Sequence, residues 1–424
     1  MELAVVLGVF LVTVPGLRPD PNSSQFQALG LARDHLFDFA AWEADALSDK
    51  ALVAASNAQA VMPEDERIQY VRDYFDLIAQ IQQLEGQVED IYVNPQVTDP
   101  LAVSADLRAQ RDALRAEQQQ RQALAEAIVQ DQVSELLVDY GFALPGDQIF
   151  PPVMDRFTQL PTIMIISPRD HIERTDAYPL EHGLTVDQME QLENSVDNEL
   201  DVSTLIVPIG GLAVWPAMLI ESSYTAGVVE VTAHEWTHHY LAFFPLGFNY
   251  GATRDLITIN ETVANIVGKE IGWAVMNRYY PDLAPPPPDY TPQPETLPAP
   301  EPQNQEPPAF DFRAEMHETR VHVDDLLAAG QIDEAEQYME QRRQVFVANG
   351  YQIRKLNQAY FAFYGSYADQ PGATGSDPIG PALRDLRYYS DSLIDYIQKV
   401  RGVTTFEEIQ ALLAQARAES EVGR

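Results

Sequence analysis

The chain has 424 residues, 46% of them hydrophobic, and it contains no cysteine. This length and composition predict a globular protein with room for a catalytic domain and at least one further unit, while disulfides, cysteine-ligated zinc and thiol catalysis are excluded. The formal net charge is −37, with 64 acidic against 27 basic residues, which argues against nucleic acid and anionic membrane surfaces as partners.

An almost wholly apolar run occupies residues 3–14, close to the amino terminus. It is shorter than the ~20 residues of a transmembrane helix but matches the apolar centre of a signal peptide. Only Met1 and Glu2 precede it, so the basic residues that usually stand before such a centre are missing. We expect residues 1–17 to be an export signal or a membrane anchor. The alternative is a short buried helix in a cytoplasmic protein.

Residues 22–145 are predicted to be helical, because apolar side chains recur every three or four positions from Ile68 to Ile91 and again from Leu107 to Leu137. Two proline-containing pairs, Asn94-Pro95 and Asp99-Pro100, interrupt the pattern. We therefore expect an antiparallel helical hairpin. Such a hairpin could associate with a second copy of the chain, cover a cleft, or act as a spacer from a membrane.

A small mixed sheet is predicted within residues 150–280. Thr162 to Ile166 is a β-rich run that we expect as an inner strand of this sheet. A second β-rich region, from Ser203 to Glu221, is broken by proline and glycine. Because proline confines a strand to a sheet edge, and a free edge can pair with an extended peptide, we expect an edge strand from Ala213 to Ile220 that includes Val214 and Trp215.

The most informative stretch is His234-Glu235-Trp236-Thr237-His238, an HExxH motif. Its neighbours are apolar and free of glycine and proline, which predicts a helix. On a helix, His234 and His238 share one face a turn apart, so both can bind one Zn²⁺ at about 2.0–2.1 Å. Glu235 lies roughly 100° around the helix, where it can take a proton from a metal-bound water without being a ligand.

A third ligand is predicted at Glu261, which opens a second helix-like run with apolar residues at spacings of three and four. Three protein ligands leave the fourth position of a tetrahedral zinc open for water, as a catalytic site requires. The alternative is that the histidines are surface or core residues without a metal. That alternative explains neither the spacing nor the downstream glutamate.

The pattern His234-Glu235-x-x-His238 with Asn260-Glu261-x-x-x-Asn265 resembles the gluzincin zinc metallopeptidases, the thermolysin-like and aminopeptidase-like group. The resemblance implies that the two histidines and Glu261 bind zinc and that Glu235 is the general base. Many members carry an aspartate four residues beyond the third ligand, which orients a ligand histidine. This chain has Asn265 there, and an amide can accept the same hydrogen bond without bringing a negative charge.

The resemblance also implies roles for other residues. In gluzincins an edge strand before the metal helix holds the substrate backbone, which fits the expected strand at Ala213 to Ile220. Glu221 would bind a substrate amino terminus, as in the aminopeptidase branch, or is a carboxylate favourable near a helix start. Related enzymes stabilise the oxyanion with a tyrosine or histidine. Tyr364 is our candidate among several, although its spacing from Tyr360 also suits a helix core.

Two further segments complete the chain. Residues 281–308 are rich in proline, which predicts an exposed linker or insertion; a ligand for a proline-binding module is the alternative. Residues 309–424 are predicted to be helical, and the resemblance implies that they form a lobe along the far wall of the cleft, with residues 372–380 as a loop near its rim.

The expected fold is therefore α+β and predominantly helical. It has an N-terminal helical hairpin, then a zincin-like domain with a small mixed sheet carrying an edge strand, two metal-site helices and a C-terminal helical lobe. The expected function is zinc-dependent hydrolysis of a peptide or protein, with one Zn²⁺ per chain. The alternatives are a non-catalytic envelope scaffold with a structural metal site and a zinc hydrolase of non-peptide bonds. Cleavage specificity, exo- or endopeptidase action and oligomeric state stay open.

Overall fold

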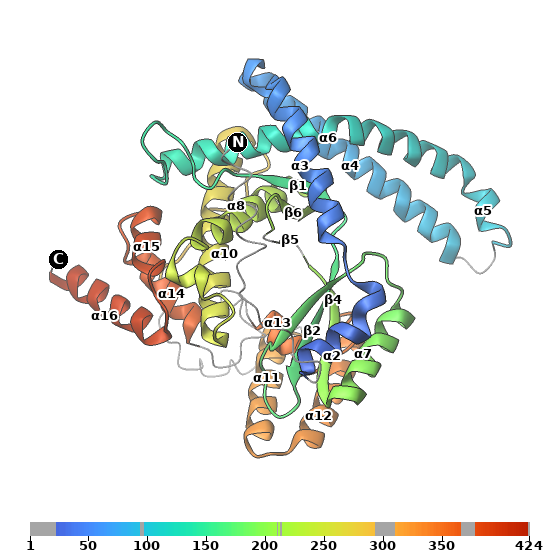
Figure 1. The fold of residues 1–424 in the computed structure, drawn as a ribbon, viewed down its shortest axis with the longest axis vertical. Coiled ribbons are helices and arrows are strands. Elements are labelled where there is room, and N and C mark those ends of the chain that lie inside the picture. The colour runs from blue at the N-terminus through green and yellow to red at the C-terminus, as the bar shows by residue number, and fades with distance from the viewer. Residues whose placement is uncertain are drawn as a thin grey trace, which may run out of the picture.

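The computed structural model describes residues 23–93, 97–209, 211–212, 214–292, 310–365 and 378–422. These residues are predominantly helical and include two small sheets (Figure 1), which confirms the predicted α+β class. Among them, no helix combines the length and apolar character needed to cross a membrane. The expected signal or anchor segment, residues 1–17, lies outside the described ranges.

Two long helices, α4 (Glu64–Val93) and α6 (Ala105–Asp139), lie side by side as the hairpin expected from the apolar spacing (Figure 1). The short α5 (Pro100–Val103) lies between them, and the Asp99 side chain caps it by accepting a hydrogen bond from the Ala102 N–H. The arms bury facing apolar side chains, which include Val71, Phe75, Ile78, Ala125, Ile128 and Val129.

The amino-terminal elements connect this hairpin to the rest of the molecule. They are α2 (Ser24–Ala32), a short 3-10 helix η1 (Arg33–His35), α3 (Phe39–Ser56) and a second 3-10 helix η2 (Ala58–Val61). Helix α3 packs on α6, whereas α2 packs on α7 and β3 of the antiparallel sheet described next.

The first sheet is antiparallel, and its strand order is β3-β2-β4. Its strands are β2 (Thr162–Pro168), β3 (Asp176–Leu180) and β4 (Val202–Pro208). Both faces are covered, one by α2 and α7 (Val186–Leu200) and the other by α13 (Gln358–Tyr364). Burial on both faces explains the continuous apolar run in β2, which is an inner strand as predicted.

The second sheet is mixed, with the order β1-β6-β5; β1 runs parallel and β5 antiparallel to β6. Its strands are β1 (Asp155–Thr158), β5 (Gly211–Leu212) and β6 (Ala217–Ile220). Two predictions were wrong here. β2 belongs to the other sheet, and the strand that precedes the metal helix is central instead of an edge strand. Val214 and Trp215 lie outside β5 and β6. They precede Pro216, which has no backbone N–H to donate to a neighbouring strand. Ala213 lies outside the described residues.

The outer edge of β1 is occupied by side chains of α6. Gln122 donates to the Phe157 carbonyl, Glu126 accepts from the Phe157 N–H at 2.8 Å, and Gln130 donates to the Asp155 carbonyl at 2.9 Å. These three residues are four apart, so they form one stripe along the helix. The stripe satisfies backbone groups that an edge strand would otherwise leave open.

Three charged side chains are buried where α3, α6 and β1 meet. Lys50 pairs with Glu126, and Asp155 accepts a hydrogen bond from the Thr232 hydroxyl at 3.1 Å. The Asp155 Oδ1 atom has no hydrogen-bond partner. Burial raises the pKa of Asp155 to about 6, against the attraction of Lys50.

The raised pKa of Asp155 makes the stability of the fold depend on pH. The folded protein keeps this proton up to about pH 6, whereas the unfolded chain loses it near 3.8, so the contribution of Asp155 to the free energy of unfolding falls as pH rises through this window. Between pH 5 and pH 8 the free energy of unfolding of the wild type should fall by about 1 kcal/mol more than that of Asp155→Asn. Denaturant unfolding at both pH values measures the difference, and equal losses in the two proteins would contradict it.

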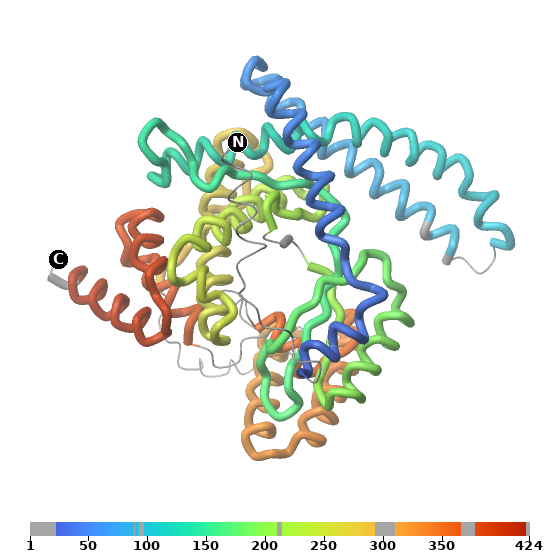
Figure 2. Tube along the Cα trace, viewed as in Figure 1, coloured from blue at the N-terminus to red at the C-terminus, as the bar shows by residue number. Residues whose placement is uncertain are grey.

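The helices that follow form two groups rather than one lobe (Figure 2). α11 (Phe312–Ala328) and α12 (Ile332–Ala348) pack together, and their core continues into α13 on the antiparallel sheet. α14 (Ile379–Tyr388), α15 (Leu393–Val400) and α16 (Phe406–Val422) instead join the core of α10. Most of the proline-rich segment, from residue 293 onward, and residues 372–377 of the expected rim loop lie outside the described ranges.

Candidate metal centre

Two helices carry the candidate site, α8 (Thr225–Leu241) and α10 (Arg254–Tyr279). Both are longer than expected at their amino-terminal ends, and Glu261 lies two turns inside α10 rather than at its start. The Thr253 hydroxyl caps α10 by accepting from the Leu256 N–H at 3.2 Å. The two helices pack together through buried apolar side chains, which include Val229, Ala233, Ile259, Val263 and Val267.

Glycines on α10 allow the two helices to approach closely. A Cβ atom at Gly268 would lie 2.9 Å from the Glu230 carbonyl oxygen and 3.1 Å from the His234 Cβ. A Cβ at Gly272 would lie 2.8 Å from the Glu230 Cα. Larger side chains at these positions would push α10 away from the helix that carries the histidines, so the glycines help to set the distance from Glu261 to the HExxH motif.

The rotation of α8 is set by Trp236. Its indole ring is buried among Phe142 and Tyr240, and its N–H donates to the Pro151 carbonyl at 2.8 Å. With Trp236 turned into the core, the helix period places His234 and His238 together on another face, which α10 covers. The apolar residues of the motif therefore orient the ionisable ones.

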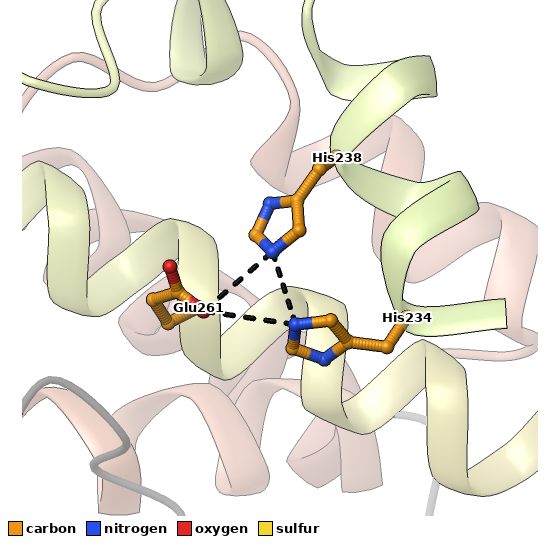
Figure 3. Close-up of side chains that lie close together, drawn as sticks. All are labelled: His234, His238 and Glu261. Atoms are coloured by element: carbon orange, nitrogen blue, oxygen red, sulfur yellow. Dashed lines mark hydrogen bonds and ion pairs between the residues drawn. The ribbon is translucent and has the colours of Figure 1, made fainter. Parts of the chain in front are cut away.

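Glu261 and the two histidines converge on one point (Figure 3). The Nε2 atoms of His234 and His238 are 3.0 Å apart. Glu261 Oε2 lies 3.7 Å from the first and 3.5 Å from the second. Ligand atoms around a tetrahedral zinc at 2.0–2.2 Å are about 3.3–3.6 Å from one another, so the observed distances bracket the expected range. Two imidazoles and one carboxylate are also a donor set that suits catalytic zinc, and the residues fit this metal.

Asn260 holds the ring of His238. Its Oδ1 atom lies 2.7 Å from His238 Nδ1, and its Nδ2 donates to the Leu246 carbonyl at 3.4 Å, which determines which way the amide faces. With Nδ1 carrying the proton, the lone pair of Nε2 faces the convergence point. Asn265, for which an orienting role was predicted, is buried five residues farther along the same helix, and its role stays a prediction.

The ionisable groups of the site are buried and shift one another's pKa values. Burial alone would lower the pKa of His238, but Glu261 outweighs it and raises that pKa to about 9. Burial would likewise raise the pKa of Glu261, and the two histidines hold it well below its usual range. The three side chains are at most 12% exposed, so water screens these charges little.

Glu235 lies beside the cluster and is not part of it. The residue is 5% exposed, and burial raises the pKa of its carboxyl, partly against the attraction of His234 and His238. Its burial next to the candidate ligands is compatible with the proton-acceptor role predicted from the sequence.

Two residues at the site were missed by sequence analysis. The hydroxyl of Tyr250 donates to Glu261 Oε1, and the guanidinium of Arg174 donates to the Tyr250 oxygen at 2.8 Å. Tyr250 stands on the loop between α9 (Pro245–Phe248) and α10, and Arg174 on the loop between β2 and β3. Residues on connecting loops follow no period, so no spacing could have linked them to the motif.

The remaining candidates have other contacts. The Val214 carbonyl accepts from His239 Nε2 at 2.8 Å, and the Trp215 indole donates to the Pro152 carbonyl at 3.4 Å. Glu221 follows β6 and pairs with Arg115 and Gln118 of the hairpin. Tyr364 ends α13 and packs against Tyr360, with ring centres 4.5 Å apart. Among the residues that the structure describes, Tyr250 is a tyrosine whose hydroxyl contacts a predicted ligand, Glu261.

Comparison of the chain with protein-family models, with curated proteins and with solved structures found no match in any of the three.

Proposed function

We propose that the protein is a zinc-dependent peptide hydrolase with a zincin-like arrangement of α8 and α10. The observation that carries the proposal is the convergence of His234, His238 and Glu261 at distances suited to one tetrahedral ion. The buried Glu235 beside them supports a catalytic role, because a structural site needs no adjacent base.

The chemistry can be divided between the metal and the chain. A bound zinc ion would polarise the scissile carbonyl and bring the pKa of water at the site to about 7. Glu235 removes a proton from the attacking water while the water oxygen bonds to the carbonyl carbon. When the carbon–nitrogen bond breaks, Glu235 returns that proton to the leaving amine. Asn260 keeps the His238 ring turned so that Nε2 faces the metal position.

Zinc content and peptide hydrolysis together test the proposal. Purified full-length protein should contain one zinc per chain and should cleave members of a peptide library; a chelator should stop cleavage and added zinc should restore it. Protein that binds no zinc would refute the proposal. Bound zinc without any hydrolysis would indicate a structural site in a scaffold, and hydrolysis confined to an ester or epoxide panel would indicate a different substrate class.

A further inference from the structure

The two oxygens of Glu261 have different partners. Oε2 is the atom near both histidine nitrogens, at 3.7 and 3.5 Å. Oε1 accepts the hydrogen bond from the Tyr250 hydroxyl.

Arg174 determines the direction of that hydrogen bond. A guanidinium can only donate, so the Tyr250 oxygen must accept from Arg174, at 2.8 Å. The single hydroxyl proton is then free to point at Glu261. The Arg174 guanidinium carbon also lies 5.7 Å from the centre of the Tyr250 ring, within the range of a cation–π contact. Both hydrogen bonds thus run in one direction: Arg174 donates to Tyr250, and Tyr250 donates to Glu261.

The loop that carries Arg174 is itself held firmly. The Thr175 N–H donates to the Ile166 carbonyl at 3.0 Å, and the Glu173 N–H donates to the Ser167 hydroxyl at 3.1 Å. At the start of the loop, Arg169 makes two hydrogen bonds of 2.8 Å to Glu336 on α12. Arg174 therefore reaches the α8–α10 site from an anchored loop of the antiparallel sheet.

We propose that Tyr250 and Arg174 are positioning residues that restrict Glu261 to binding the metal through one oxygen, and that they connect the metal site to the β2–β3 loop. The inference rests on the zinc site proposed above. If the phenol were removed, Oε1 would be free to bind the metal as well. The carboxylate would then occupy the coordination position that an open catalytic site keeps for water.

The test uses the full-length protein loaded with Co²⁺ in place of zinc. Its visible absorption reports coordination number, since four-coordinate cobalt absorbs more strongly than five-coordinate cobalt. Tyr250→Phe should weaken the absorption and lower zinc affinity, measured against a competing chelator, by about 10- to 100-fold. Arg174→Gln should also weaken the absorption and lower the zinc affinity. Arg174→Lys keeps a donor, so its absorption and zinc affinity should lie between those of Arg174→Gln and the wild type.

A matched control exists in a second arginine–tyrosine pair, in which Arg401 donates to the Tyr240 hydroxyl at 3.0 Å. Tyr240→Phe keeps the ring that packs on Trp236. This variant and Arg401→Gln make the same chemical changes away from Glu261, so they should leave the cobalt spectrum and zinc affinity at wild-type values. Wild-type values in Tyr250→Phe and Arg174→Gln would overturn the inference and leave the zinc site intact. A wild-type protein that binds neither metal would instead refute the proposed function on which the inference rests.

Discussion

Glu235→Gln is expected to abolish peptide hydrolysis while zinc stays bound. The amide has nearly the same shape as the carboxyl, but it cannot accept a proton from water, so the loss should reach about 10²- to 10⁴-fold in kcat. Because Glu235 is not among the three converging ligands, the metal content should stay at one per chain. Metal analysis and steady-state hydrolysis on the same preparation measure both quantities.

Glu235→Asp tests whether the position of the carboxyl matters for hydrolysis as well as its presence. The shorter side chain keeps the acid but withdraws it by one methylene, so activity should lie between those of the glutamine variant and the wild type. Full activity in Glu235→Gln would show that another group accepts the proton and would refute the assigned role.

Glu261→Ala should remove the metal itself. Glu261 supplies one of the three converging ligand atoms, and without it the two histidines lose the carboxylate that offsets the charge of the ion. Loss of a residue that only supports a ligand lowers metal affinity by about 10- to 100-fold. The fall in zinc affinity in Glu261→Ala should be larger than this. Chelator competition measures the affinity, and hydrolysis should disappear with the metal.

A second buried glutamate of α10 provides the control. Glu270 makes two hydrogen bonds to Arg387, at 2.6 and 2.9 Å, and it lies outside the converging cluster. Glu270→Ala should lower the melting temperature, because it leaves a partly buried guanidinium unpaired, but zinc affinity should not change. If both variants lost zinc equally, the effect would come from damage to α10 rather than from loss of a ligand.

The long helices could be predicted well because their evidence is local. Apolar residues at spacings of three and four identified both arms of the hairpin, and proline marked the break near α5. The HExxH spacing placed His234 and His238 on one face because four residues make about one turn. These inferences needed no knowledge of how the chain packs.

The sheets were predicted less well because strand pairing is not local. The run at β2 was recognised as an inner strand, but no spacing indicates which strands are its neighbours, and it pairs with β3 and β4 in a sheet of its own. Pro216 was taken as the mark of an edge strand. The chain instead bends before it, and β6 starts at Ala217 with partners on both sides.

The sequence by itself identified the candidate ligands and the proposed proton acceptor, and it determined the face that the two histidines share, since these depend on side-chain chemistry and on the geometry of a single helix. Only the tertiary structure decided how far Glu261 stands from them, because that distance follows from the close crossing of α8 and α10 at Gly268. It also decided that Asn260 orients His238 and that Arg174 reaches Glu261 through Tyr250. Such contacts join residues far apart in the chain, and they form only when separate elements pack together.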